Sequence, residues 1–208
     1  MLPSRHIPII LYFLYISGIQ AADTFTVATF NVENYFLTKF ETRSMKPKLS
    51  RAKVVDAIVS IHPDVLALQE IGRRAALVDL GKRLKLKGLE YPHHEWVVGP
   101  DPAIHLAVLS RFPLTVHSHT NVMYLLDRRR FRVGRGFGEV RVQVNDNYGF
   151  TLLNAHLKSK RPVPQASESE MRLREARALR RIVEARLMAD TSANILVVGD
   201  LNDTPNAE

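Results

Sequence analysis

Polar side chains that can support hydrolytic chemistry follow an apolar run near the end of the 208-residue chain. Ile195 to Val198 is apolar and mostly β-branched, which predicts a strand buried on both faces. Asp200 and Asn202 come directly after it, and on an extended backbone their side chains would point the same way. Pro205 prevents further ladder pairing. The pattern predicts a carboxylate and an amide side by side, although an Asx turn that bonds only local backbone fits the same residues.

Other apolar runs also end in polar side chains, namely Asn31, Glu70 and His156. These residues can meet if their strands lie in facing sheets. One carboxylate with amide oxygens suits a hard cation such as Mg²⁺, which keeps several waters and shares the substrate phosphate. His156 can donate to a phosphate oxygen or protonate a leaving group, and Asp200 can align or deprotonate a water that Asn202 holds. Each residue alone is better explained as a satisfied polar group at a strand end, but the set supplies the parts for metal-assisted phosphodiester cleavage.

The elements that must position these residues alternate between strands and helices. Period-2 or continuous apolar patterns predict strands at Thr24–Phe30, Val65–Leu68, Glu95–Val98, Ile104–Leu109 and Leu114–His117, and a hairpin formed by Glu139–Val144 and Phe150–Leu153. Apolar residues spaced by three and four predict helices at Lys46–Ile61, Arg73–Leu86 and Ser167–Asp190. No internal repeat interrupts this order. The length suits one domain.

The charge balance favours an anionic partner. Lys and Arg number 29 against 21 Asp and Glu, which gives a formal net charge of +8. Much of the surplus lies in Asp127–Gly138, a segment that contains five arginines and three glycines. This segment can follow a phosphate backbone, and a solvated charged loop fits it equally well. The chain has no Cys, which excludes disulfides, thiolate metal sites and a cysteine nucleophile.

The first 22 residues have the composition of a secretory signal peptide. Arg5 and His6 precede a largely apolar run from Ile7 to Ile19, and the small residues Ala21 and Ala22 follow it. The run is short for a membrane span, and an uncleaved N-terminal anchor is the alternative. We therefore expect a secreted or periplasmic protein whose mature domain occupies residues 23–208.

Five short motifs resemble the endonuclease/exonuclease/phosphatase superfamily, which includes deoxyribonucleases, abasic-site endonucleases, sphingomyelinases and inositol-polyphosphate 5-phosphatases. The motifs occur in the order of the family and are Thr29–Val32, Leu66–Glu70, Ala107–Pro113, Asn154–Ser159 and Gly199–Pro205. The resemblance implies an α/β fold, a four-layer α/β/β/α sandwich of two facing, mostly antiparallel sheets. It also implies that members continue past the last motif to an Asp-His pair. The domain is therefore expected to be incomplete at the C-terminus, and a chain that ends at Glu208 to bind phosphodiesters with little turnover.

The resemblance also implies roles for particular residues. Glu70 and Asn31 are expected at the metal, with Glu70 as the direct ligand. Asp200 and Asn202 are expected to act on the water and the phosphate. His156 is expected to contact the phosphate, and Arg135 aligns loosely with an arginine that some members use in the same way. His105, in the predicted strand Ile104–Leu109, is expected either to reach the site or to face its neighbour strand.

The function expected from these features is that of a metal-dependent phosphodiester hydrolase, with Mg²⁺ as the cofactor and Mn²⁺ or Ca²⁺ as alternatives. The basic surplus favours nucleic acid as the substrate, and hence a secreted or periplasmic nuclease. A sphingomyelinase-like lipid phosphodiesterase that acts on membrane lipid is the enzymatic alternative. A non-catalytic phosphate or nucleic-acid binder is the third hypothesis. The sequence leaves open the substrate, endo or exo cleavage and the oligomeric state.

Overall fold

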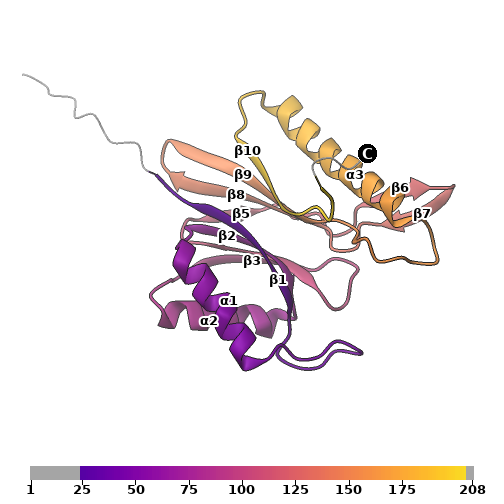
Figure 1. Cartoon of the computed structure of the whole chain (residues 1–208). Coiled ribbons are helices and arrows are strands. Elements are labelled where there is room, and N and C mark those ends of the chain that lie inside the picture. Colours follow the sequence, from indigo (N-terminus) through magenta and orange to yellow (C-terminus); the bar gives the residue numbers. More distant parts are fainter. Residues whose placement is uncertain (1–23, 205–208) are drawn as a thin grey trace, which may run out of the picture.

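The computed structural model describes residues 24–204, so the predicted signal peptide lies outside the described residues. Two four-stranded sheets face each other, with helices on both outer faces (Figure 1). The helices are α1 (Lys48–Ile61), α2 (Arg74–Leu86) and α3 (Glu168–Ala189). They begin and end within two residues of the predicted positions. Among the described residues, no helix is long and apolar enough to cross a membrane.

The first sheet has the order β1-β2-β4-β3. Its strands are β1 (Val27–Tyr35), β2 (Val65–Ile71), β3 (His93–Val97) and β4 (His105–Ser110). Strand β1 pairs in parallel with β2, whereas β4 is antiparallel to both β2 and β3. The parallel pair follows from α1, which carries the chain back across the sheet between the two strands.

The second sheet has the order β10-β9-β8-β5. Its strands are β5 (Leu114–Val116), β8 (Phe137–Asn145), β9 (Tyr148–His156) and β10 (Ile195–Asp200). Strands β8 and β9 form the predicted hairpin, and α3 connects β9 to the parallel strand β10. Each sheet therefore contains one parallel pair and two antiparallel pairs, as the expected sandwich of mostly antiparallel sheets requires.

Three apolar layers hold the sandwich together. Between the sheets, Val65, Ala67 and Val108 pack against side chains of β8 and β9. Helices α1 and α2 cover the outer face of the first sheet, and α3 covers the outer face of the second with Ala178 and Leu179. The four layers are thus α1 and α2, the first sheet, the second sheet, and α3 (Figure 1).

Two sequence predictions about β10 are wrong. The strand does not end before Gly199 but continues to Asp200. It is also not buried on both faces, because Leu196 and Val197 are 37% and 39% exposed. The physical reason is its position, since β10 lies at the edge of the sheet and, among the described strands, pairs only with β9.

The arginine-rich segment Asp127–Gly138 is more regular than predicted. Strands β6 (Met123–Leu126) and β7 (Arg129–Arg132) form a two-stranded antiparallel ribbon, and β8 begins at Phe137. The ribbon is anchored from one side, where Tyr124 and Leu126 join the apolar layer beneath α3. The segment is therefore largely a structured ribbon and not an irregular loop, although Arg128, Arg129, Arg130 and Arg132 remain exposed to solvent.

Candidate functional site

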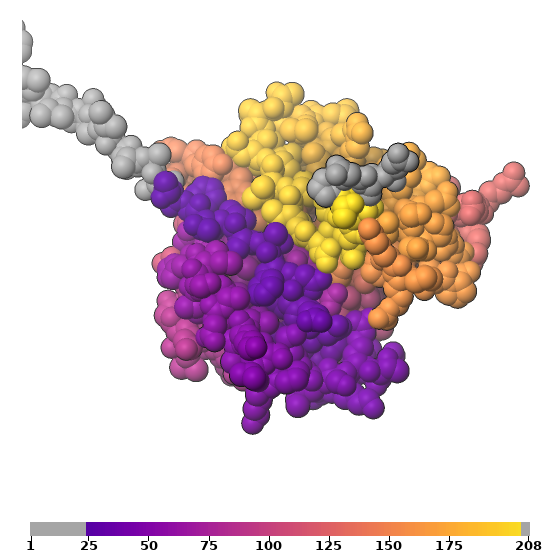
Figure 2. Space-filling view, viewed as in Figure 1, coloured from indigo at the N-terminus to yellow at the C-terminus, as the bar shows by residue number. Residues whose placement is uncertain are grey.

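The parallel pair in each sheet brings the polar strand-end residues together. In the first sheet, Asn31 lies opposite Gln69, the neighbour of Glu70. In the second sheet, Asp200 lies opposite His156. Figure 2 shows the indigo N-terminal strand beside the yellow C-terminal strand at the centre of this face. The carboxyl ends of the two pairs therefore meet where the sheets converge.

Asn31 links the two carboxylates of the site. Its Nδ2 donates to Asp200 Oδ2 at 2.8 Å and lies 3.4 Å from Glu70 Oε1, while its Oδ1 accepts from the backbone N–H of Glu33 at 2.9 Å. A carboxylate only accepts, so the amide must present its NH₂ group to both. In this arrangement Asn31 positions the carboxylates, and its oxygen is engaged by the backbone N–H of Glu33.

Glu70 is aimed into the site by an irregular backbone. Its φ is 61°, in the left-handed region that non-glycine residues seldom occupy. The pairing of β2 with β4 shifts register between Leu68 and Ile71, which is the signature of a bulge that redirects a side chain. The backbone N–H of Asn34, itself at φ 51°, donates to Glu70 Oε2 at 2.9 Å. Strain of this kind is characteristic of functional positions.

His156 lies buried behind the two carboxylates. Its Nε2 is 4.0 Å from Glu70 Oε1 and 3.9 Å from Asp200 Oδ2. Burial, together with the positive charge of Arg135, lowers the pKa of His156 to about 4, although Glu70 and Asp200 oppose the shift. The imidazole is therefore neutral at neutral pH and carries one donor and one acceptor nitrogen. Its Nδ1 has no hydrogen-bond partner among the described residues.

Asp200 is held as an anion at the end of β10. Burial favours its neutral form, but the hydrogen bonds from Asn31 and from the backbone N–H of Asn202 outweigh burial and lower the pKa of Asp200. The bond from Asn202 N to Asp200 Oδ1 is 2.9 Å long and closes the Asx turn that was the alternative interpretation. The carboxylate therefore keeps a fixed orientation.

The prediction that Asn202 points the same way as Asp200 is wrong. Asn202 lies beyond the strand at φ 54°, so the extended-backbone assumption fails. Its Nδ2 instead donates to the carbonyl of Leu157 at 2.9 Å. Asn202 thus fixes the turn that supports Asp200, and it also ties the end of β10 to the segment that follows β9.

A polar cavity of about 580 Å³ opens beside Glu70. Its lining carries several basic side chains, namely Arg43, Arg135, Lys158 and Arg161. Arg135 is among these lining residues, and its Nε lies 3.7 Å from Asp101 Oδ2. Arg43 donates to Asn34 Oδ1 at 2.7 Å, and Asn34 in turn holds Glu70 through its backbone N–H. A cavity with a carboxylate at one wall and cations around it suits a metal-bound phosphate.

A buried amide pair behind the site was missed at the sequence level. Gln69 Nε2 donates to Asn154 Oδ1 at 2.8 Å across the two sheets. The Asn154 amide in turn donates to the carbonyls of Leu68 and Ala107, each at 3.0 Å. The available signal was an amide inside each of two otherwise apolar strands, because a buried amide needs a partner. Lys158 and Arg161 were also missed as lining residues, although they lie two and five residues after His156 in the chain.

His105 does not join the site. It packs edge-on against Trp96, with ring centroids 4.9 Å apart. Burial lowers its pKa, and its Nδ1 has no hydrogen-bond partner in the part of the chain that the structure describes. Of the two expectations for this residue, the one that places it against the neighbouring strand is confirmed.

The donor set fits a cation that needs few protein ligands. Within residues 24–204, no group of three or more His, Asp or Glu side chains is placed to hold one metal ion. Such a group would be expected for Zn²⁺, whereas Mg²⁺ is commonly held by one or two carboxylates, waters and substrate phosphate. Glu70 and Asp200, both close to one neutral imidazole, supply carboxylates whose charge a divalent cation would balance. Glu70 is the better placed, because it also faces the cavity.

Several solved structures have the same fold as this chain. No curated protein matches the chain. Among solved structures, a beta toxin variant of Staphylococcus aureus with bound magnesium ions is 16% identical with a TM-score of 0.64. Sphingomyelinase C of Streptomyces griseocarneus is 19% identical with a TM-score of 0.62. The human Nocturnin catalytic domain with a bound sulfate anion is 14% identical with a TM-score of 0.57. Each comparison covers 88% of this chain and 66% of the other.

These likenesses support the four-layer fold, and the chain spans about two thirds of the length of the structures that it matches. A family model provides the stronger assignment. The model for the Endonuclease/Exonuclease/phosphatase family matches residues 28–208, a range that includes all five sequence motifs and every residue of the site. The chain therefore belongs to the Endonuclease/Exonuclease/phosphatase family.

Proposed function

We propose that the protein is a Mg²⁺-dependent phosphodiesterase, with nucleic acid as its substrate. The observation that carries the proposal is the meeting of Glu70, Asp200 and His156 around Asn31, beside a cavity lined by basic side chains. Family membership supports hydrolysis of phosphodiesters. The excess of 29 Lys and Arg over 21 Asp and Glu supports a polyanionic substrate.

Each side chain has a role that its geometry suits. Glu70 would hold the cation, which when bound neutralises phosphate charge and polarises the phosphorus centre. Asp200, fixed by two donors, aligns or deprotonates the attacking water. His156 is a neutral imidazole that donates to a phosphate oxygen. Arg135 lies across the cavity and binds the phosphate by charge.

The supporting residues keep these groups in place. Asn31 fixes the separation of the two carboxylates, since one NH₂ group faces both. Asn202 acts through Asp200 and through the carbonyl of Leu157, and is a positioning residue in this proposal. Displacing either amide would misplace a reacting group, and misplacement of about 1 Å can cost on the order of 100-fold in rate.

The test compares Glu70→Gln with Glu184→Gln, which removes the same charge from the outer helix α3. Hydrolysis of bis(4-nitrophenyl) phosphate, with Mg²⁺ or with EDTA, measures turnover. Mn²⁺ titration followed by electron paramagnetic resonance measures metal binding without turnover. We expect Glu70→Gln to lose metal binding and to lower hydrolysis by orders of magnitude, and Glu184→Gln to leave both unchanged. Equal metal binding by wild type and Glu70→Gln would refute the assigned ligand.

A substrate panel decides the remaining alternatives. Single-stranded DNA, duplex DNA, RNA and sphingomyelin vesicles are compared at equal protein concentration. Preferential hydrolysis of sphingomyelin would replace the nuclease proposal with the lipid phosphodiesterase. Binding of oligonucleotides without hydrolysis of any substrate would leave the non-catalytic binder. Export remains part of the proposal, supported by the composition of residues 1–22, and N-terminal sequencing of exported protein that retains Met1 would contradict it.

A further inference from the structure

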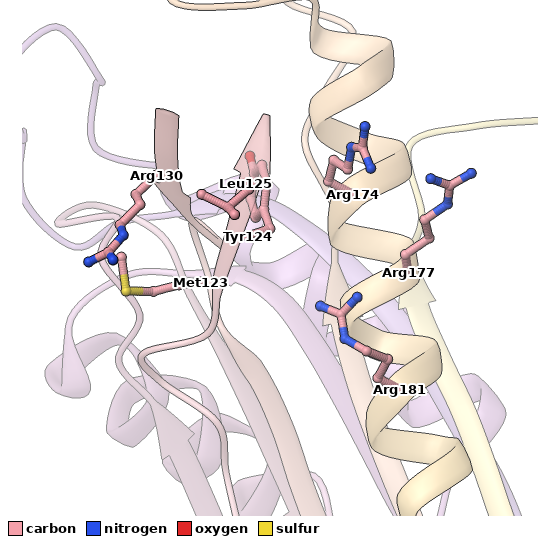
Figure 3. A pocket seen from close by; sticks show the side chains of 7 residues that line it. All are labelled: Met123, Tyr124, Leu125, Arg130, Arg174, Arg177 and Arg181. Atoms are coloured by element: carbon pink, nitrogen blue, oxygen red, sulfur yellow. The ribbon is translucent and has the colours of Figure 1, made fainter. Parts of the chain in front are cut away.

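A groove outside the catalytic site runs between the β6–β7 hairpin and α3. Its volume is about 530 Å³. The lining residues are Met123, Tyr124 and Leu125 of β6, Arg130 of β7, and Arg174, Arg177 and Arg181 of α3 (Figure 3). None of these residues lines the polar cavity beside Glu70. The hairpin side of the groove projects from the body of the molecule (Figure 2).

The arginines of the groove differ from the other arginines of α3 in having no acidic partner. Elsewhere on the helix, Arg172 pairs with Asp203 at 2.9 Å, Arg180 with Glu184 at 2.7 Å, and Arg186 with Glu139 at 2.7 Å. By contrast, the side chains of Arg130, Arg174, Arg177 and Arg181 form no ion pair or hydrogen bond within residues 24–204. Their positive charge is uncompensated.

Placing these like charges together destabilises the fold, and no ion pair of these side chains offsets the repulsion. Arg174, Arg177 and Arg181 are spaced by three and four, so they share one face of α3 and repel one another. Arg130 adds a fourth charge from the opposite wall. A bound anion that runs along the groove would relieve this repulsion. The charge pattern therefore points to a polyanion as the occupant.

The shape of the groove favours a single strand of nucleic acid over a membrane surface. The arginines line a hollow between two walls, whereas a flat bilayer calls for a protruding basic face. Leu125 is 61% exposed and Met123 is 44% exposed, so apolar surface lies next to the charges. Proteins that bind single strands combine a basic groove for the backbone with apolar or aromatic surface for the bases.

A second hollow extends the groove along α3. It has a volume of about 300 Å³, shares Arg181 with the first, and reaches Arg186 and His119. Arg174 and Arg186 are 12 residues apart, which corresponds to roughly 18 Å along a helix. About five stacked nucleotides cover that length at 3.4 Å each. The groove is thus long enough for a binding site of the size seen in single-strand binding domains.

We propose that the groove between the β6–β7 hairpin and α3 is a binding site for single-stranded nucleic acid, separate from the catalytic cavity. The assignment rests on the proposed function in one respect, because it names the polymer that the enzyme holds. Arg130, Arg174, Arg177 and Arg181 contact backbone phosphates, and the exposed side chains of Met123 and Leu125 contact bases. A strand held there is retained by the protein while the distant phosphodiester is cleaved.

The test is a binding measurement on the full chain with EDTA present, so that no hydrolysis occurs. A fluorescein-labelled oligothymidylate of about 20 nucleotides serves as the probe, and fluorescence anisotropy gives Kd over a range of salt concentrations. The variant replaces Arg174, Arg177 and Arg181 with Gln. The control replaces Lys48, Lys53 and Lys82 with Gln, which removes the same charge from α1 and α2 on the other outer layer. Thermal unfolding monitors whether each variant folds.

We expect the arginine variant to raise Kd by tenfold or more. The slope of log K against log salt should decrease in magnitude by about 2, because each lost phosphate contact on a single strand contributes about 0.7. The lysine control should change both quantities much less. Equal affinity and slope in the arginine variant and the wild type would overturn the proposal, and so would equal weakening by the control, since that would indicate a general effect of net charge.

Two further measurements separate the alternatives. Sedimentation with anionic phospholipid vesicles tests a membrane. If the arginine variant loses vesicle binding but keeps oligonucleotide binding, the nucleic-acid assignment is overturned. Hydrolysis of bis(4-nitrophenyl) phosphate, which is too small to need the groove, should be the same in wild type and the arginine variant. If neither wild type nor the arginine variant hydrolyses this substrate, and only the variant loses oligonucleotide binding, the proposed function is contradicted. The assignment of the groove as a binding site is still supported in that case.

Discussion

Gly199→Ala tests whether the contact between β9 and β10 sets the position of Asp200. Gly199 has a φ of 135°, a conformation that L-residues rarely adopt. A Cβ atom built on it would lie 1.9 Å from the carbonyl oxygen of Ala155 and 2.8 Å from its carbonyl carbon. Both atoms belong to the backbone of the neighbouring strand, so no side-chain rotation can relieve the contact. The two strands must separate locally by about 1 Å to restore an acceptable distance.

The expected magnitude combines strain and displacement. Backbone strain in a glycine-only region costs on the order of 1–3 kcal/mol, and overpacking adds about 1–3 kcal/mol. Among the described strands β10 pairs in the sheet only with β9, so it can move outward without opening the rest of the sheet. Asp200 directly follows the substituted residue, so the movement would stretch its 2.8 Å hydrogen bond with Asn31. We expect the free energy of unfolding to fall by about 2–6 kcal/mol and hydrolysis to fall by roughly 100-fold.

Urea unfolding and hydrolysis of bis(4-nitrophenyl) phosphate measure the two effects. Gly81→Ala is the matched control, because nothing lies within 4 Å of its Cβ position in the middle of α2. That substitution should stabilise the fold by about 0.5–1 kcal/mol and leave hydrolysis unchanged. If Gly199→Ala unfolds at the same urea concentration as wild type with unchanged hydrolysis, the close approach of β9 to β10 does not set the site.

Other predictions concern the buried groups around the site. Asn154→Ala removes the bond from Gln69 and the two bonds to the carbonyls of Leu68 and Ala107. It should lower the free energy of unfolding by about 2–4 kcal/mol, as measured in urea, whereas Asn147→Ala in an exposed turn should change it by less than about 0.5 kcal/mol. Burial raises the pKa of Glu175. Its contribution to the free energy of unfolding is therefore complete below the unfolded-state pKa and is lost as pH rises through the folded-state pKa. Glu175→Gln should reduce this loss of stability with rising pH in unfolding experiments, and an unaltered pH profile would contradict the raised pKa. Arg135→Gln should raise the Kd for inorganic phosphate by about tenfold in calorimetry, because charge-assisted hydrogen bonds contribute about 1.5–3 kcal/mol, and an unchanged Kd would remove Arg135 from the phosphate site.

The secondary structure was largely predictable because its patterns are local. The spacing of apolar residues in Lys46–Ile61 and Ser167–Asp190 specifies helices whatever packs against them. The continuous apolar run Val65–Leu68 specifies a buried strand for the same reason, and β2 is indeed buried. The convergence of Asn31, Glu70 and Asp200 was predictable only through the family resemblance, because the spacing of residues along the chain does not determine which sheets face each other.

The burial of β10 was not predictable from its residues. An apolar run such as Ile195 to Val198 describes what a strand can bury, but the number of its neighbours depends on the sheet order. Here one side of the strand has β9, and no described strand pairs with the other side. Leu196 and Val197 consequently remain more than one third exposed. The groove between the β6–β7 hairpin and α3 was not predictable for a related reason, because it forms between two segments that are more than 40 residues apart in sequence.

The backbone irregularities were the least predictable part of the site. Glu70 and Asn202 both have positive φ values, although nothing in the residue type of a glutamate indicates one. The strain at Glu70 is sustained by tertiary contacts, notably the hydrogen bond from Asn34. Because Asn202 turns away from an extended path, its amide bonds Leu157 and does not lie beside Asp200. A period-2 argument fails at the residues where the strand has already ended.

The site depends on the docking of the two sheets, since neither sheet contains it alone. Glu70 comes from the first sheet, and His156 and Asp200 come from the second. The Gln69–Asn154 bond lies between them, and its members are one and two residues from Glu70 and His156. The same buried amide pair that fixes the alignment of the sheets therefore fixes the separation of the catalytic groups. Local opening of this contact would dismantle the site while each sheet keeps its own hydrogen bonds, so activity should be lost before secondary structure as denaturant increases.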